Sequence, residues 1–327
     1  MIEVISGPLL SALSEQTDAS LRILLVEEPE AHLHPQLQDL LMRYLEEESG
    51  NATQVIVTSH SPNFASAARV ERLTVLARAT AADPIVARRP SDFGLDDGQL
   101  GHLRRFLDVT KASLFFARGV MLVEGVAEQL LLPAVARQLK RPLSRSGVAV
   151  INIGGVAFPP FADLFGPEKL PYPCAVVSDA DPPKANKNDE DDENEMGGTE
   201  AEDEDDPNLS PVAAALKGRE GANVRVRLAT KTLEWDLAHE ADNWDLMLEA
   251  LAAVKPRVAK SLRKDHTETD LGQRADALLK AVANRKGRFA QELVAVLETG
   301  RTLAIPSYLV EAIEWVTPDQ GDAGDDE

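Results

Sequence analysis

The sequence contains a single cysteine, Cys174, among its 327 residues, so no disulfide can form within the chain. It also has no apolar run near the ~20 residues that a membrane-spanning helix requires. Its first residues, MIEVISGPLL, lack both the basic segment and the long apolar segment of a secretion signal. We therefore expect a cytoplasmic protein that does not bind a membrane.

Positive charge is also scarce, with 34 Lys and Arg residues against 54 Asp and Glu residues, for a formal net charge of -20. The excess is concentrated in residues 189–206 and 319–327, which hold seventeen acidic residues and no Lys or Arg. The rest of the chain has 37 acidic against 34 basic residues and is nearly neutral. The charge therefore does not exclude a nucleic-acid substrate, and we expect a disordered acidic insertion at about 184–207 and a disordered acidic tail.

Strand-like and helix-like segments alternate along two stretches of the chain, which predicts parallel sheets covered by helices. The expected strands are 22–26, 54–58, 119–123, 147–153, 173–177 and 223–228, with 72–78 as a further candidate. The expected helices are 35–47 and 126–140, and residues 233–315 are almost entirely helical in pattern. The sequence thus predicts an α/β fold in which a partial α/β unit precedes a parallel-sheet domain with a helical C-terminal extension.

Pairs of acidic residues follow two strands of the second stretch. Glu124 closes the strand 119–123, and Glu128 would lie in the first turn of the next helix. Asp179 and Asp181 come directly after the strand 173–177, next to Ser178. Since the carboxyl ends of parallel strands meet at one edge of a sheet, we expect the carboxylates to converge there. The alternative is that each acid only caps a helix or lies in a turn, where Asp and Glu are common.

Clustered carboxylates repel one another unless cations neutralise them, and oxygen ligands favour Mg²⁺, Mn²⁺ or Ca²⁺ over zinc. Two such cations about 3.5–4 Å apart activate an attacking water and stabilise the leaving oxygen of a phosphodiester. We therefore expect two Mg²⁺ or Mn²⁺ ions as cofactors, with Ca²⁺ able to bind without supporting full activity. The expected reaction is phosphodiester hydrolysis, and Ser178 is a further candidate ligand.

The strand that closes in Glu124-Gly125, then Glu128, and the later Asp179-x-Asp181 resemble the Toprim domain of primases, topoisomerases and small nucleases. The resemblance implies a compact parallel sheet with an acidic edge. It also implies that these four acidic residues are catalytic metal ligands.

The first stretch resembles the end of an ABC-type ATPase domain. Residues 23–30, ILLVEEPE, are similar to its Walker B segment, residues 30–35 to its D-loop, and residues 55–62 to its switch-histidine strand. An ATPase domain followed directly by a Toprim domain is the organisation of the OLD (overcoming lysogenization defect) family of nucleases. The resemblance to that family runs from about residue 21 to residue 298.

The ATPase resemblance implies nucleotide-related roles for three residues. Glu27 would help to hold Mg²⁺, Glu28 would polarise water, and His60 would read the γ-phosphate. Glu27 departs from the aspartate that is usual in that family, although the charge is the same.

No phosphate-binding loop of the pattern G-x-x-x-x-G-K-[ST] occurs in the chain. Without this loop nothing cradles the phosphates of ATP, so we expect no independent ATPase activity. The chain is therefore similar to the C-terminal portion of a longer OLD-type protein. This implies a missing N-terminal ATPase portion as a partner, and a homodimer formed through the ATPase part as a further candidate.

Two more positions resemble functional sites of OLD nucleases. Glu234 follows the strand 223–228 and would reach the same edge as a ligand or as a support for one. Lys286 is similar to the lysine that stabilises negative charge on the transferring phosphate. The alternative for Lys286 is a solvated residue at a helix end. We expect its loss to slow catalysis without affecting folding, because exposed lysines contribute little to stability.

The domain assignment follows from these segments. Residues 1–91 are the C-terminal part of an ABC-type ATPase domain, 92–114 a connecting segment, 115–235 the Toprim catalytic domain with the acidic insertion, 236–317 a helical region that completes the nuclease, and 318–327 the acidic tail.

The expected function is a metal-dependent DNA endonuclease, with DNA as the macromolecular substrate. Two alternatives remain open. One is a topoisomerase-like or primase-like Toprim enzyme, although the pattern places none of Tyr44, Tyr172 and Tyr308 for nucleophilic attack. The other is an ABC-like interaction or dimerisation fragment whose Toprim part is a non-catalytic scaffold.

Overall fold

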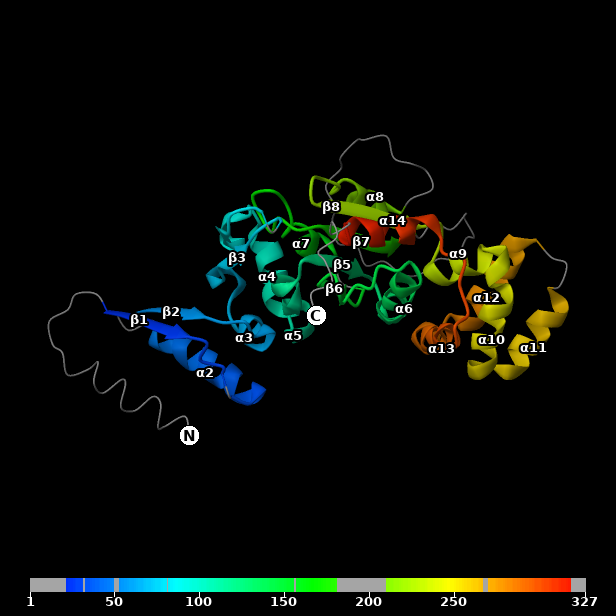
Figure 1. Cartoon of the computed structure of the whole chain (residues 1–327), viewed down its shortest axis with the longest axis horizontal. Helices are drawn as coiled ribbons and strands as arrows, with labels where there is room; N and C mark the ends of the chain where they lie inside the picture. The colour runs from blue at the N-terminus through cyan, green and yellow to red at the C-terminus, as the bar shows by residue number, and fades with distance from the viewer. Residues whose placement is uncertain are drawn as a thin grey trace, which may run out of the picture. The chain divides into compact units, whose positions relative to one another are not determined.

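The structure is a computed structural model that describes residues 22–31, 33–49, 53–80, 82–155, 157–180, 210–266 and 270–318. The chain forms two compact units (Figure 1). The first comprises Met1–Ala77 with Ile85–Phe116, and the second comprises Arg78–Pro84 with Ala117–Glu327. The predicted acidic insertion and acidic tail lie outside the described residues, apart from the tail's first residue. Among the described helices, none combines the length and apolar character needed to cross a bilayer.

The first unit begins with a βαβ arrangement. Its elements are β1 (Arg22–Glu27), α2 (Pro35–Glu48), β2 (Thr53–Thr58), α3 (Pro62–Ala67) and the 3-10 turn η1 (Val70–Arg72). Strands β1 and β2 are parallel and in register, with Leu25 opposite Ile56. His34 caps α2 through its ring nitrogen, and Pro35 occupies the first helical position, where proline has no hydrogen bond to lose. The expected strand–helix–strand order is confirmed here.

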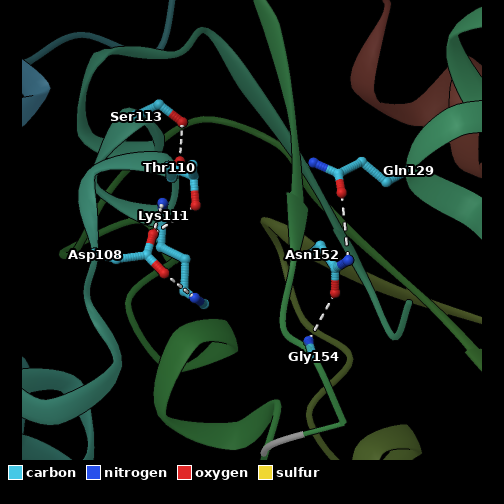
Figure 2. Close-up of polar contacts among 7 residues, drawn as sticks. All are labelled: Asp108, Thr110, Lys111, Ser113, Gln129, Asn152 and Gly154. Carbon is cyan, nitrogen blue, oxygen red and sulfur yellow. Dashed lines mark hydrogen bonds and ion pairs between the residues drawn. The ribbon is translucent and has the colours of Figure 1, made fainter. Parts of the chain in front are cut away.

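A small antiparallel hairpin and several short helices complete this unit. They are β3 (Val75–Ala77), β4 (Val86–Arg88), η2 (Pro90–Asp92), α4 (Asp97–Phe106), α5 (Val109–Ala112) and η3 (Ser113–Phe116). The candidate strand 72–78 is shorter than expected, and its antiparallel partner β4 was not predicted. A strand of only three residues is too short to show the alternation of apolar and polar residues by which a strand is recognised in a sequence. Side chains cap the N-termini of two of these helices. Asp96 and Gln99 form a capping box on α4, and Asp108 caps α5 (Figure 2).

The second unit is built on a sheet of four parallel strands in the order β6-β5-β7-β8. The strands and their connecting helices are β5 (Gly119–Val123), α6 (Val126–Gln138), β6 (Val148–Asn152), α7 (Pro159–Ala162), β7 (Cys174–Asp179), α8 (Pro211–Lys217) and β8 (Val224–Ala229). All five residues of β5 are buried, as expected of a central parallel strand covered on both faces. The predicted parallel α/β domain is therefore confirmed.

The helical extension follows β8 without interruption by further strands among the described residues. It consists of α9 (Leu233–His239), η4 (Ala241–Asn243), α10 (Trp244–Val254), α11 (Pro256–Asp265), α12 (Leu271–Val282), α13 (Lys286–Glu298) and α14 (Ser307–Val316). Helix α14 returns to pack on β7 and β8, and α13 packs on α6 (Figure 1). Phe289 and Leu293 of α13 belong to the same buried core as Met121 and Val123 of β5. The extension and the sheet thus share one core.

Candidate functional site

The corner between β5 and α6 carries the first acidic pair. Glu124 follows the last residue of β5, and Glu128 lies in the first turn of α6, as the spacing predicts. The backbone N–H of Gly125 donates to Oε2 of Glu128 over 3.1 Å, which completes the N-terminus of the helix. Glu128 is buried. Oε2 of Glu128 therefore caps the helix, as the alternative interpretation of the sequence predicts. Oε1 takes no part in this cap.

The end of β7 lies beside this corner, because β5 and β7 are parallel neighbours. The strand extends to Asp179, two residues further than expected, so Ser178 and Asp179 belong to the strand itself. The hydroxyl of Ser178 donates to Oε2 of Glu124 over 3.3 Å. This contact links the two strand ends that the sequence predicted to converge. Asp181 lies outside the described residues.

The turn between β8 and α9 brings a fourth acidic side chain. Glu234 is 2% exposed and lies in the first turn of α9, where the Thr232 hydroxyl donates to its Oε2 over 3.2 Å. The backbone N–H of Leu233 donates to Oδ1 of Asp179 over 3.2 Å. Helix α9 is therefore joined to the end of β7 through a side chain of the acidic cluster.

Lys286 supplies a positive charge to the same cluster. It is the first residue of α13, whose buried Phe289 and Leu293 hold the helix in the core. Its ammonium lies 2.9 Å from Oε2 of Glu234 and 3.8 Å from Oδ2 of Asp179. The side chain is 36% exposed and lies against both carboxylates.

The clustering changes the acidity of these groups. Burial raises the pKa of Asp179 to about 8, and the neighbouring charges of Glu124, Glu128 and Glu234 add to the rise, while the Lys286 ammonium opposes it. Burial also raises the pKa of Glu128. For Lys286, burial acts to lower the pKa, but the nearby carboxylates outweigh it and the pKa is raised. Burial and the neighbouring carboxylates thus favour the protonated form of Asp179 and Glu128 in the protein without a cation.

The donors suit a hard divalent cation, because they are carboxylate and hydroxyl oxygens. Oε1 of Glu234 is buried and has no hydrogen-bond partner among the described residues, which leaves an acceptor available to a cation. Glu124, Glu128, Asp179, Glu234 and Ser178 are the residues that would hold it. Within the described part of the chain, no three acidic, histidine or cysteine side chains are already gathered as a ligand set. Binding of a cation would therefore require these side chains to move closer together.

The turn after β6 borders the same edge of the sheet. Asn152 receives the backbone N–H of Gly154 on its Oδ1 over 2.7 Å, and its amide nitrogen donates to Gln129 over 3.3 Å (Figure 2). The backbone N–H of Gly155 donates to the carbonyl oxygen of Glu124 over 3.2 Å. The Asn152 side chain thus connects this turn to Gln129 of α6, the residue that follows Glu128.

The three residues for which the sequence predicts nucleotide-related roles, Glu27, Glu28 and His60, lie in the first unit. His60 lies 3.5 Å from Glu28, measured from Nε2 to Oε1. Oε1 of Glu30 receives the Ser59 hydroxyl over 2.6 Å and the backbone N–H of His60 over 3.0 Å. The side chain of Glu27 is exposed at the end of β1. The structure therefore brings Glu28 and His60 together at the ends of adjacent strands.

Two buried groups near the acidic cluster were not predicted from the sequence. Asp236 in α9 is 7% exposed, and the Tyr308 hydroxyl in α14 is buried without a partner among the described residues. Burial raises the pKa of Tyr308, and the charges of Asp236, Asp179 and other carboxylates of the cluster add to the rise. The spacing of Asp236 two residues after Glu234 was an available signal, whereas nothing local marks Tyr308.

Comparisons with protein families match both parts of the chain. Residues 115–181 match the Toprim domain of the family described as overcoming lysogenization defect protein-like, and residues 6–66 match an AAA domain family.

Individual relatives are similar over different lengths. An OLD nuclease of Thermus scotoductus is 32% identical over 41% of this chain and 26% of its own length. The endonuclease GajA of Bacillus cereus is 21% identical over 91% of this chain and 49% of its own length. The solved C-terminal region of the Xanthomonas campestris pv. campestris OLD protein is 28% identical over 63% of this chain and 94% of that chain, with a TM-score of 0.44. The chain spans about half the length, or less, of the curated relatives it matches.

Proposed function

We propose that this chain, which carries an OLD-like Toprim domain in residues 115–181 after part of an AAA-type ATPase domain, is the DNA-cutting part of a metal-dependent endonuclease. One observation carries the proposal: four acidic side chains and a lysine lie together at the ends of adjacent parallel strands. They are Glu124, Glu128, Asp179, Glu234 and Lys286. Two relatives that are named as nucleases support the same class of reaction.

The residues of the cluster have distinct roles in this proposal. Glu124, Glu128, Asp179 and Asp181 would hold two Mg²⁺ or Mn²⁺ ions, with Glu234 and Ser178 as further ligands or supports. When bound, such cations supply positive charge that lowers the pKa of an attacking water and stabilises the leaving oxygen of the phosphodiester.

The chain's own groups prepare the site for that substrate. The Gly125 N–H orients Glu128, the Leu233 N–H orients Asp179, and the Ser178 hydroxyl orients Glu124. The Lys286 ammonium opposes the negative charge that develops on the phosphate during cleavage. Because Glu128 is buried and Glu124, Asp179 and Lys286 are partly buried, water screens their charges less than it would at the surface.

The test is incubation of supercoiled plasmid with the protein and Mg²⁺, Mn²⁺, Ca²⁺ or EDTA. We expect nicked and linear products with Mg²⁺ or Mn²⁺, little product with Ca²⁺ and none with EDTA. Glu124→Gln should reduce the rate by orders of magnitude, while Asp245→Asn, an exposed aspartate on α10, should cut at the parental rate. Full cleavage in EDTA would overturn the proposal.

The same assay separates the alternatives. A topoisomerase would give topoisomer ladders, but Tyr172 is 4% exposed and the Tyr308 hydroxyl is buried, so neither is presented for attack on DNA. A non-catalytic scaffold would leave the plasmid unchanged under every condition. The raised pKa of buried Asp179 favours a functional site, since a scaffold gains nothing from concentrating carboxylates.

The first unit fits a role within a longer ATPase domain. Ile23, Leu25 and Ile56 lie on the same face of the β1–β2 pair and are 52%, 71% and 47% exposed. Isolated pairs of strands rarely leave such a face in water in a stable domain. We therefore propose that an N-terminal ATPase portion completes this sheet, and that a homodimer forms through the ATPase part.

A further inference from the structure

The carboxylate of Asp236, in α9, accepts a hydrogen bond that does not cap the helix itself. Its carboxylate is 7% exposed, and Oδ2 receives the backbone N–H of Thr230 over 2.7 Å. Its other oxygen, Oδ1, is buried and has no hydrogen-bond partner among the described residues. Thr232 already caps the helix by receiving the N–H of Trp235. The hydrogen bond from Thr230 to Asp236 therefore holds the turn that precedes the helix.

This turn, residues 230–233, carries two contacts of the acidic cluster. The Leu233 N–H reaches Asp179, and the Thr232 hydroxyl reaches Glu234. Glu234 in turn lies against the Lys286 ammonium at 2.9 Å. A shift of the turn would therefore move the partners of Asp179 and Glu234 together.

We propose that Asp236 is a positioning residue that fixes the turn 230–233 and thereby sets the relative placement of Asp179 and Glu234 for cation binding. The inference rests on the proposed function, because it concerns how the acidic cluster is held. Asp236 itself does not touch the substrate. Groups that orient metal ligands in this way typically change metal affinity or activity about 10–100-fold when they are removed.

The turn has a second contact, on its solvent-exposed side, and it is weaker than the contact with Asp236. The Lys231 ammonium pairs with Asp276 of α12 over 2.8 Å, and the Trp235 ring nitrogen donates to the same carboxylate oxygen. Lys231 and Asp276 are 40% and 58% exposed, so water weakens that contact. The buried hydrogen bond from Thr230 to Asp236 is the stronger restraint on the turn.

The experiment compares the parental protein with Asp236→Ala, Asp236→Asn and the exposed control Asp245→Asn. Three quantities are measured: the Mn²⁺ dissociation constant by calorimetry, the melting temperature, and hydrogen exchange along residues 224–254. We expect Asp236→Ala to weaken Mn²⁺ binding about 10–100-fold. Asp236→Asn should lose less, because the amide keeps one oxygen that accepts from the turn. Exchange should rise at residues 230–233 and stay unchanged in α10.

Each outcome decides the inference. Parental Mn²⁺ affinity in Asp236→Ala would overturn it, and so would exchange that rises evenly through α9 and α10, since that pattern indicates loss of folding. If Asp236→Ala does not fold, Asp236→Asn decides: weaker Mn²⁺ binding at a parental melting temperature supports the inference, and parental binding overturns it. A parental protein that binds no Mn²⁺ and cuts no plasmid overturns the proposed function and this inference with it.

Discussion

Lys286 illustrates how burial changes the expectation for a single residue. From the sequence, its loss is expected to leave stability unchanged, because exposed lysines contribute little. The structure contradicts that premise, since the ammonium pairs at 2.9 Å with Glu234, which is 2% exposed. Removing the lysine leaves the buried Glu234 carboxylate without its charged partner, and that costs stability.

We therefore predict two effects of Lys286→Ala. Cleavage should slow by about 10²–10³, as is typical when a preorganised charge is removed. The melting temperature of the metal-free protein should also fall, because Glu234 loses its counter-charge. Plasmid cleavage rates and thermal unfolding measure the two effects. Lys280→Ala, an exposed lysine on α12, is the matched control and should change neither. A parental cleavage rate in Lys286→Ala would contradict the catalytic role.

Asp179 gives a prediction about pH. Its pKa is raised from 3.8 to about 8, first by burial, so the folded protein favours the protonated carboxyl. The stabilising contribution of this group is complete below pH 4 and is lost as the pH rises through about 8. In EDTA, the free energy of unfolding of the parental protein should therefore fall between pH 5 and pH 8.

The variant Asp179→Asn tests this dependence because it cannot ionise. We expect its free energy of unfolding, measured by urea titration in EDTA, to fall less than that of the parental protein over the same pH range. Asp245→Asn should follow the parental curve, since Asp245 is 81% exposed. Identical pH dependence in Asp179→Asn and in the parental protein would show that other groups are responsible.

At the scale of elements, the turn after β6 is a support for the acidic corner. Gly154 and Gly155 have positive φ angles of 70° and 71°, and the Gly155 N–H donates to the Glu124 carbonyl. The left-handed conformation costs a non-glycine residue about 1–2 kcal/mol. The glycines are therefore required by the turn's backbone and not by lack of space, since neither Cβ position has an atom within 4 Å.

Gly155→Ala should accordingly destabilise the protein by about 1–2 kcal/mol in urea unfolding. Gly101→Ala is the matched control, because Gly101 lies inside α4 with no atom within 4 Å of its Cβ position. Alanine favours a helix interior over glycine by about 0.8–1.0 kcal/mol, so this variant should be more stable than the parent. Equal changes in both variants would contradict the role of backbone conformation.

At the scale of the whole molecule, the two units differ in how complete their sites are. The acidic cluster draws on β5, β7, α9 and α13 of the second unit. The first unit holds Glu28 and His60 side by side, but the sequence contains no phosphate-binding loop. ATP binding needs that loop to cradle its phosphates.

We therefore predict that this chain alone has no ATPase activity. A steady-state phosphate-release assay should give the rate of a buffer blank with or without Mg²⁺. The variant Glu28→Gln should not differ from the parental chain in this assay. Ordinary turnover that Glu28→Gln abolishes would show that another segment binds the nucleotide.

Much of the architecture is encoded locally and could be predicted from the sequence. The strand–helix order follows from apolar periodicity, and the expected ends of β5 and β2 lie within one residue of those in the structure. The placement of Glu124 and Asp179 at neighbouring strand ends follows from the geometry of parallel sheets. These features depend on residues close together in the chain, where pattern and structure are directly linked.

The remainder depends on contacts between distant segments, for which the sequence has no local signal. The meeting of Lys286 with Asp179 and Glu234 and the buried position of Tyr308 arise when α13 and α14 pack on α6 and the sheet. The resemblance to a nuclease family identified Lys286 as a candidate. Its distance to the carboxylates became known only from the fold. The sequence determined which residues carry charge, and tertiary packing decided which charges meet, because burial and proximity are properties of the assembled core.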